Sequence, residues 1–177
     1  MSRWNLANGA VFQLAWFACV IGGAAGTSLW GAVALAALLG MSIYGGSSGR
    51  DLGLAGAIAT VGFMLESLWI HTGVLDYQGA SLAPAWIVML WAAVGLTVNH
   101  CLSMFKARPW LGGLLAGAGA PFSYLGGERL GAVIVDAPIE LLAVSAVWLV
   151  LFTAIFMAAR EVDRMVAGPG SEFERVH

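Results

Sequence analysis

Glu66 is the clearest residue of this chain whose type and position could do chemistry. It interrupts the apolar run Gly62-Phe-Met-Leu-Glu-Ser-Leu-Trp69. A carboxyl removed from water without a partner favours its protonated form, and ionisable groups in long apolar segments usually face a cavity or a protein interior. Two interpretations stay open. Glu66 lines a functional cavity, or it is a structural carboxyl satisfied by hydrogen bonds or by the outer surface.

Four further polar side chains interrupt apolar runs and could form a hydrogen-bonded cluster. Asn8 and Gln13 stand in the first run, and Asn99 and His100 stand late in the fourth. If successive runs are antiparallel helices, Asn8 lies at the same depth as Asn99 and His100, which predicts an inner polar cluster. No second His stands at metal-ligand spacing, so we expect no metal site and no cofactor.

The run from Gly113 to Glu128 combines close-packing glycines with a proline, a phenol and a carboxylate. Its members recur at steps of three or four residues and therefore share one helix face: Gly113, Gly117, Pro121, Tyr124 and Glu128. Pro121 has no amide hydrogen and crowds the carbonyl of Gly117. The sequence therefore predicts a helix that is kinked at Pro121.

The end of this face predicts a site for a polar head group. Arg129 follows Glu128, and its guanidinium can pair with a carboxylate or hold a phosphate or carboxylate group. We take Glu66, Tyr124, Glu128 and Arg129 as candidate ligand-binding residues. The alternative is that Glu128 and Arg129 form an interfacial pair. The usual nucleotide, zinc-protease and serine-hydrolase motifs are absent from the sequence, so it assigns no catalytic residue.

The composition shows which elements must position these residues. The chain has 177 residues, of which 60% are hydrophobic and 10% charged, and its mean hydropathy is +0.85. Soluble domains carry about a quarter charged residues, so this composition is typical of a membrane protein. Six apolar runs approach the length of about 20 residues that crosses a bilayer, near 6–24, 27–45, 52–71, 84–104, 110–128 and 139–159.

The basic residues predict the orientation of these six spans. Of the 8 Lys and Arg residues, Arg129 alone falls on one side, and the others share the opposite side with both termini. Because basic residues concentrate in cytoplasmic loops, both termini are predicted to be cytoplasmic. We expect an all-α membrane protein, built as an up-down bundle of six transmembrane helices.

The sequence predicts one domain followed by a short tail. We expect a single transmembrane domain over 1–160 and a polar cytoplasmic tail over 161–177. The Gly113-xxx-Gly117 spacing lets two helices approach closely within one molecule. The same spacing also suits a homodimer interface, so a second copy of the chain is a candidate partner.

Several motifs resemble a bacterial inner-membrane family catalogued as domain of unknown function 2878. The resemblance rests on Ala120-Pro-Phe-Ser-Tyr124 with Gly127-Glu-Arg-Leu-Gly-Ala132, on Asn8 with Phe12-Gln13, and on Pro84-Ala-Trp86 with Leu90-Trp91 and Asn99-His100. It covers roughly residues 5–160. It implies a multipass protein of the bacterial inner membrane and hints at a place in lipid metabolism, with lipid-metabolism enzymes as partners. It supplies no active site.

Three functions follow as hypotheses. The first is a protein that binds a lipid-like amphipathic molecule or assists its modification, with membrane lipids as partners. The second is a small proton-coupled carrier that uses Glu66 and His100, and the third is an intramembrane lipid-modifying enzyme that uses His100 with Glu66 or Glu128. No basic face supports nucleic-acid binding.

Overall fold

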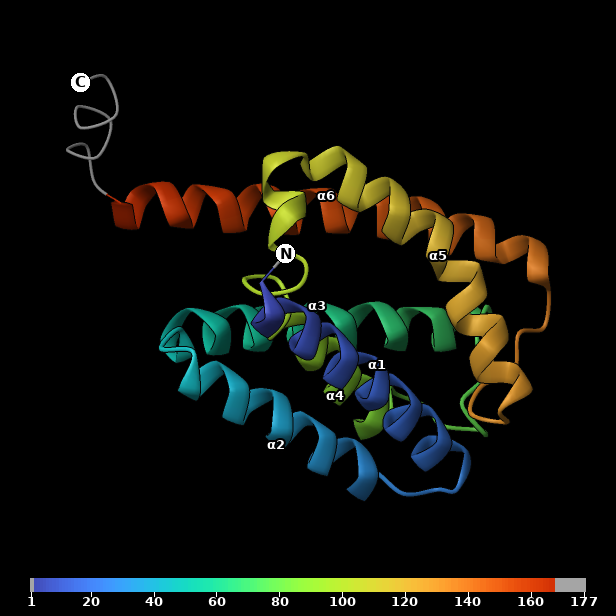
Figure 1. Cartoon of the computed structure of the whole chain (residues 1–177). Helices are drawn as coiled ribbons and strands as arrows, with labels where there is room; N and C mark the ends of the chain where they lie inside the picture. The colour runs from blue at the N-terminus through green and yellow to red at the C-terminus, as the bar shows by residue number, and fades with distance from the viewer. Residues whose placement is uncertain (1, 168–177) are drawn as a thin grey trace, which may run out of the picture.

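Six α-helices make up nearly all of the structure. The computed structural model describes residues 2–167. The helices are α1 (Arg3–Ala24), α2 (Leu29–Tyr44), α3 (Ser48–Thr72), α4 (Ala85–Gly95), α5 (Pro109–Arg129) and α6 (Leu141–Ala167), with 3-10 helices η1 (Ser103–Ala107) and η2 (Pro138–Glu140) (Figure 1). Within residues 2–167 the only β pairing is an isolated bridge between Asp76 and Ile134. The predicted all-α class is confirmed.

Three helical segments are long and apolar enough to cross a membrane: Arg3–Ala24, Gly49–Thr72 and Pro138–Val166. Helices α2 and α4 are apolar but have only 16 and 11 residues. At 1.5 Å per residue they span about 24 Å and about 16 Å, less than the hydrocarbon core of about 30 Å. The composition of α1, α3 and α6 is therefore that of membrane helices.

The fourth apolar run does not form the continuous helix over 84–104 that the sequence predicted. Helix α4 ends at Gly95, and turns with short i to i+3 hydrogen bonds follow, such as His100 N–H to the Thr97 carbonyl at 3.0 Å. The Thr97 hydroxyl donates to the carbonyl of Val94. The end of α4 therefore coincides with a change to i to i+3 bonding, which tightens the turns that follow.

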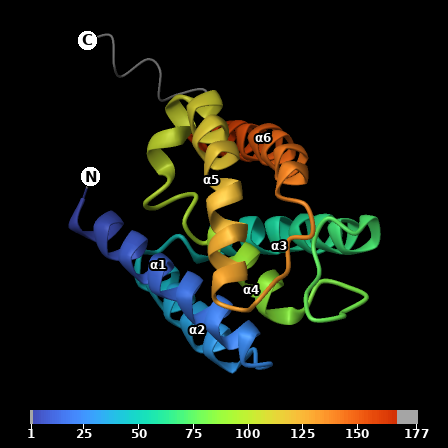
Figure 2. The ribbon, with the colours of Figure 1, turned by 90° about the vertical axis from the view of Figure 1, so that its right-hand side faces the viewer.

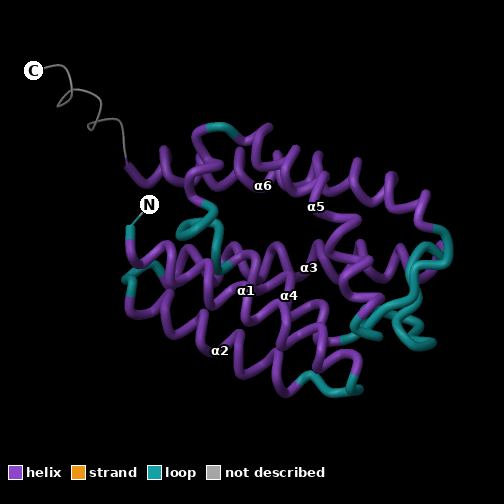
Figure 3. Tube along the Cα trace, turned by 45° about the vertical axis from the view of Figure 1, so that its right-hand side comes forward, coloured by secondary structure: helices purple, strands orange, loops and turns teal. Residues whose placement is uncertain are grey.

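The helices form two layers, α1–α4 and the hairpin of α5 and α6 (Figures 2 and 3). In the hairpin, the face of Gly113 and Gly117 lies directly on α6. A Cβ at Gly117 would lie 2.8 Å from the Ser145 carbonyl oxygen, and one at Gly113 would overlap Thr153. The close-packing spacing thus serves contact between two helices of the same chain.

Helix α5 stays helical through Pro121 and bends in its second half, where it leaves α6 and runs toward α1 and α4 (Figure 1). Helix α6 continues to Ala167, so residues 161–167 of the expected tail are helical. The rest of that tail, 168–177, lies outside the described residues. The bend opens space between the hairpin and the other layer.

Candidate functional site

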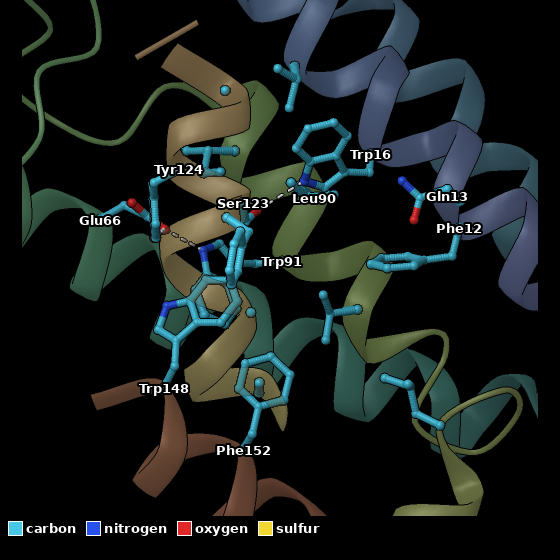
Figure 4. Close-up of a pocket in the computed structure, with 18 of the residues that line it drawn as sticks. Phe12, Gln13, Trp16, Glu66, Leu90, Trp91, Ser123, Tyr124, Trp148 and Phe152 are labelled. Carbon is cyan, nitrogen blue, oxygen red and sulfur yellow. Dashed lines mark hydrogen bonds between the residues drawn. The ribbon is translucent and has the colours of Figure 1, made fainter. Parts of the chain in front are cut away.

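A cavity of about 510 Å³ lies where α5 leaves α6. Its walls come mainly from α1, α4, α5 and α6 and are almost entirely apolar or aromatic, including Phe12, Trp16, Trp91, Trp148 and Phe152 (Figure 4). Ligand pockets typically enclose about 300–1,000 Å³ and combine apolar walls with a few polar groups. This cavity has that size and that lining.

The main polar group of the cavity is Glu66, which is 0% exposed. Its Oε1 accepts hydrogen bonds from Trp91 Nε1 at 2.9 Å and from the Tyr124 hydroxyl at 2.7 Å, and its Oε2 accepts one from the Tyr77 hydroxyl at 2.6 Å. We call Glu66, Tyr77, Trp91 and Tyr124 the Glu66 cluster. Its donors come from three different elements, so the cluster joins the two layers.

One face of α3 places Glu66 in this position. Its buried residues recur at steps of three or four: Asp51, Ala55, Ile58, Gly62, Glu66 and Trp69. Gly62 is needed one turn before Glu66, because a Cβ there would overlap the indole ring of Trp91. The glycine lets Trp91 lie against α3, and the indole N–H then reaches Glu66.

The loop between α3 and α4 supplies Tyr77 and closes this end of the cavity. Its backbone pairs with the loop after α5 through Asp76 N–H to Ile134 O at 3.0 Å and Ile134 N–H to Asp76 O at 2.7 Å. Gln78 Nε2 donates to Gly131 O at 3.1 Å and to Ala24 O at 3.5 Å. Burial, together with the charge of Glu66, raises the pKa of the Tyr77 phenol well above its ordinary value, so the phenol remains a donor at neutral pH.

Two further properties bear on what the cavity can hold. Among the described residues that line it there is no Lys, Arg or His. Trp148 Nε1 is buried and has no hydrogen-bond partner among the described residues. The cavity therefore contains an acidic group with no basic counterpart, and a spare donor.

A second polar cluster lies at the opposite end of α3 around Asp51, which is 0% exposed. Asp51 accepts from Ser42, from Ser47 at 2.6 Å and from Asn99 Nδ2 at 2.7 Å, and pairs with His100 Nε2 at 2.8 Å. We call these residues the Asp51 cluster. Lys106 ties it to α6, since Lys106 Nζ donates to Asn99 Oδ1 at 2.9 Å and to Asp163 Oδ2 at 2.6 Å.

The Asp51 cluster does not have the geometry of a serine-hydrolase relay. Such a relay uses both ring nitrogens of the histidine. Here Ser47 Oγ at 3.3 Å and Asp51 Oδ2 at 2.8 Å both contact His100 Nε2. A polar hollow of about 420 Å³ borders His100, with Trp4, Tyr44, Gly45, Ser47 and Asn99 around it.

Of the four residues predicted for ligand binding, the structure brings two together. Tyr124 bonds Glu66 directly. Glu128 instead accepts the backbone N–H of Val135 at 3.0 Å and so holds the loop after α5. Arg129 is exposed at the end of α5 and makes no hydrogen bond or ion pair within residues 2–167.

The predicted inner polar group is also divided. Asn99 and His100 belong to the Asp51 cluster. Asn8 is buried, accepts from the Cys101 N–H at 3.3 Å and leaves its Nδ2 without a partner among the described residues. Gln13 lies on the wall of the large cavity. His100 contacts Asp51, which lies about 22 Å from Glu66 along the axis of α3, so no direct proton transfer joins His100 and Glu66.

Sequence reasoning missed Asp51, Tyr77 and Trp91. Asp51 carries the clearest available signal, because it continues the three-and-four spacing of the buried α3 face that contains Glu66. Tyr77 lies in a loop, where no periodicity indicates which side chains turn inward. No group of three or more His, Cys, Asp or Glu residues in the described part of the chain could hold a metal ion.

Comparison with known proteins gives one match. The model of a family described as protein of unknown function (DUF2878) matches residues 5–154, and this is the family that the sequence motifs indicated. No curated protein and no solved structure matches the chain.

Proposed function

The chain belongs to the DUF2878 family of proteins of unknown function, and we propose that it is a six-span membrane protein that binds an amphipathic, lipid-like molecule in the cavity beside the Glu66 cluster. The observation that carries this proposal is an apolar cavity of about 510 Å³ with one buried carboxyl. A molecule with an apolar body and a polar end matches both properties.

The proposed topology is supported by the direction of the helices. The loops after α1, α3 and α5 gather at the right-hand end of Figure 1, and the turn after α2 and the end of α6 lie toward the left. Residues 85–107, as α4 followed by turns and η1, would cross together. In this topology Arg129 lies on one side and the other Lys and Arg residues share the side of the two termini, so the proposal places both termini in the cytoplasm of a bacterial inner-membrane protein.

The proposed route into the cavity is lateral, between α1 and α5. One side-chain hydrogen bond links these helices, from Trp16 Nε1 to Ser123 Oγ at 3.2 Å (Figure 4). Phe122, which lines the cavity from α5, is 78% exposed. In a bilayer this exposed apolar edge faces lipid, so an amphipathic molecule enters without crossing water.

Arg129 and Glu128 take separate roles in this proposal. Arg129, exposed at the end of α5, meets anionic lipid headgroups at the interface. Glu128 fixes the loop that pairs with the Tyr77 loop. Lipid-metabolism enzymes and a second copy of the chain remain the proposed partners.

Filling the cavity tests the proposal. Gly119 lines the cavity, and a Cβ there meets no atom within 4 Å, so Gly119→Leu adds an apolar side chain at the cavity wall. We expect at least a several-fold loss of co-purifying amphiphile, measured by mass spectrometry of the protein extracted in mild detergent.

Gly56→Leu is the matched control, since Gly56 is also helical, also has no atom within 4 Å of a built Cβ, and lies away from the cavity. It should retain the amphiphile. Equal lipid content in wild type, Gly119→Leu and Gly56→Leu would contradict the proposed binding site.

A proton-coupled carrier is a second candidate, favoured by one observation. Glu66 and Asp51 are both buried carboxyls on the same face of α3, one near each end. Ionisable side chains within membrane segments often belong to the proton pathways of pumps and transporters. Flux of an alkylamine driven by a pH gradient across reconstituted membranes would distinguish a carrier from a binding protein.

A further inference from the structure

We propose that the cavity selects amphiphiles whose polar end is an ammonium group, and that Glu66 holds this group. The inference rests on the proposed function, because it specifies the head of the molecule that the cavity binds. It follows from the charge of the lining, from the free acceptor capacity of Glu66 and from the aromatic walls around it.

The lining has an acidic group and no basic one. Glu66 is its sole carboxyl, and the described lining residues include no Lys, Arg or His. Of its three partners, Trp91 Nε1 can only donate a hydrogen bond. Donors around Glu66 can stabilise its ionised form, but no basic side chain of the lining pairs with it, and a buried charge is costly until it is paired. A cationic ligand supplies the missing charge.

Glu66 also has one acceptor site that no donor among the described residues uses. A carboxylate offers about four lone-pair sites. Oε1 accepts two hydrogen bonds, from Trp91 and Tyr124, whereas Oε2 accepts one, from Tyr77. The remaining site is on Oε2, and an ammonium N–H can fill it with a charge-assisted hydrogen bond.

Aromatic rings complete the environment of a cation. Trp86 packs on Tyr77 with ring centroids 5.6 Å apart, and Trp148 packs on Tyr124 at 5.8 Å and on Trp91 at 5.4 Å. All five rings line the cavity. The negative faces of Trp and Tyr attract ammonium groups, most strongly where water is excluded.

The same lining disfavours other heads. A carboxylate or phosphate would face Glu66 with no basic side chain in the cavity to neutralise it. An alcohol could bond Glu66 but would leave its charge unpaired. The preferred ligand is therefore a long-chain amine without an anionic group beside its nitrogen.

Two matched probes test this selectivity. A long-chain alkylamine and the alkanol of equal chain length, each brominated on the chain, quench the fluorescence of the cavity tryptophans on binding. In an uncharged maltoside detergent at neutral pH, wild type should bind the amine about tenfold or more tightly than the alcohol, since a charged hydrogen bond is lost with the alcohol. In Glu66→Gln, which removes the charge of the carboxyl, we expect the preference for the amine over the alcohol to be lost.

The outcomes separate the inference from the proposed function. Equal affinities in wild type, or tighter alcohol binding, would overturn the amine preference and leave amphiphile binding intact. Quenching by neither probe in wild type would overturn the proposed function itself. Displacement of the amine by an equal concentration of phosphatidylethanolamine, whose ammonium stands next to a phosphate, would contradict the exclusion of anionic neighbours. Circular dichroism shows whether Glu66→Gln is folded, and the wild-type comparison of amine with alcohol decides the preference even where this variant is not.

Discussion

At the scale of single residues, the Glu66 cluster joins segments that are far apart in the chain. Tyr77 and Tyr124 each donate to the carboxyl, at 2.6 Å and 2.7 Å, from the loop after α3 and from α5. A hydrogen bond to a charged group contributes roughly 1.5–3 kcal/mol, and an orphaned buried acceptor costs about as much. The cluster should therefore hold α5 in place as well as bind a ligand.

Removing one phenol measures this contribution. Tyr124→Phe keeps the ring and deletes the donor to Glu66, so we expect the free energy of unfolding to fall by about 1–3 kcal/mol. Chemical unfolding in detergent micelles, followed by circular dichroism, provides the measurement. Tyr44→Phe is the control, because Tyr44 is 90% exposed and should leave stability unchanged. If the two variants are equally stable, the hydrogen bond contributes nothing.

The sequence could predict some of these residues because their signals are local. A carboxyl in an apolar run marks Glu66, and a shared helix face marks Tyr124. Tyr77 approaches Glu66 only because the loop that carries it pairs with the loop after α5, at Asp76 and Ile134. Such long-range pairing leaves no pattern in a single sequence. The sequence did not predict that Asp51 contacts His100. Asp51 stands in the first turn of a helix, where acidic residues are common because they suit the helix dipole.

At the scale of helices, glycines decide how closely the elements approach. Gly62 brings α4 against α3, and Gly113 and Gly117 bring α6 against α5. In lipid, association depends on this close packing, because apolar contacts with the bilayer are as favourable as those between helices. The contact at Gly62 is special, since it also determines whether Trp91 reaches Glu66.

Gly62→Ala should disturb both packing and the site. Its methyl group would overlap the Trp91 indole, and overpacking of this kind costs about 1–3 kcal/mol. We expect a lower free energy of unfolding and a changed tryptophan fluorescence spectrum. Gly56→Ala, in open space on the same helix, should be neutral or slightly stabilising, because alanine favours helix. An unchanged spectrum in Gly62→Ala would show that Trp91 does not depend on this glycine.

Helix type was predictable along most of the chain, and helix ends were less so. Apolar runs marked all six helices, but α4 stops at Gly95, and the Thr97 hydroxyl then bonds the carbonyl of Val94. Hydropathy does not mark this helix end, since five of the nine residues 96–104 are still apolar. Conversely, α6 continues to Ala167 through charged residues, where an ion pair of Arg164 with Glu161 at 2.7 Å spans one turn.

At the scale of the whole molecule, two buried polar clusters are separated by apolar packing. The α3 face between Asp51 and Glu66 consists of Ala55, Ile58 and Gly62. None of these side chains can relay a proton. The large cavity borders Glu66 and not Asp51, so a ligand bound there would contact only the Glu66 cluster.

This separation distinguishes the two proposed functions. A binding protein predicts no flux of an alkylamine driven by a pH gradient across reconstituted vesicles, with wild type equal to Glu66→Gln. A carrier predicts flux in wild type that falls at least tenfold in Glu66→Gln and in Asp51→Asn, because both buried carboxyls would titrate in each cycle. Protein-free vesicles set the background, since neutral amines cross bilayers unaided. Flux above that background would favour the carrier over the binding protein.

The residues of the Glu66 cluster are far apart in the sequence, so the ribosome makes Glu66 well before it makes Tyr124. Glu66 and Tyr124 are separated by 58 positions. At 5–20 residues per second, the ribosome adds that length in roughly 3 to 12 seconds. Throughout this interval α3 carries a carboxyl that lacks one of its final donors, in surroundings where unsatisfied polar groups are costly. Completion of the cluster therefore coincides with arrival of the last hairpin, and an uncovered Glu66 marks a nascent chain whose assembly is unfinished.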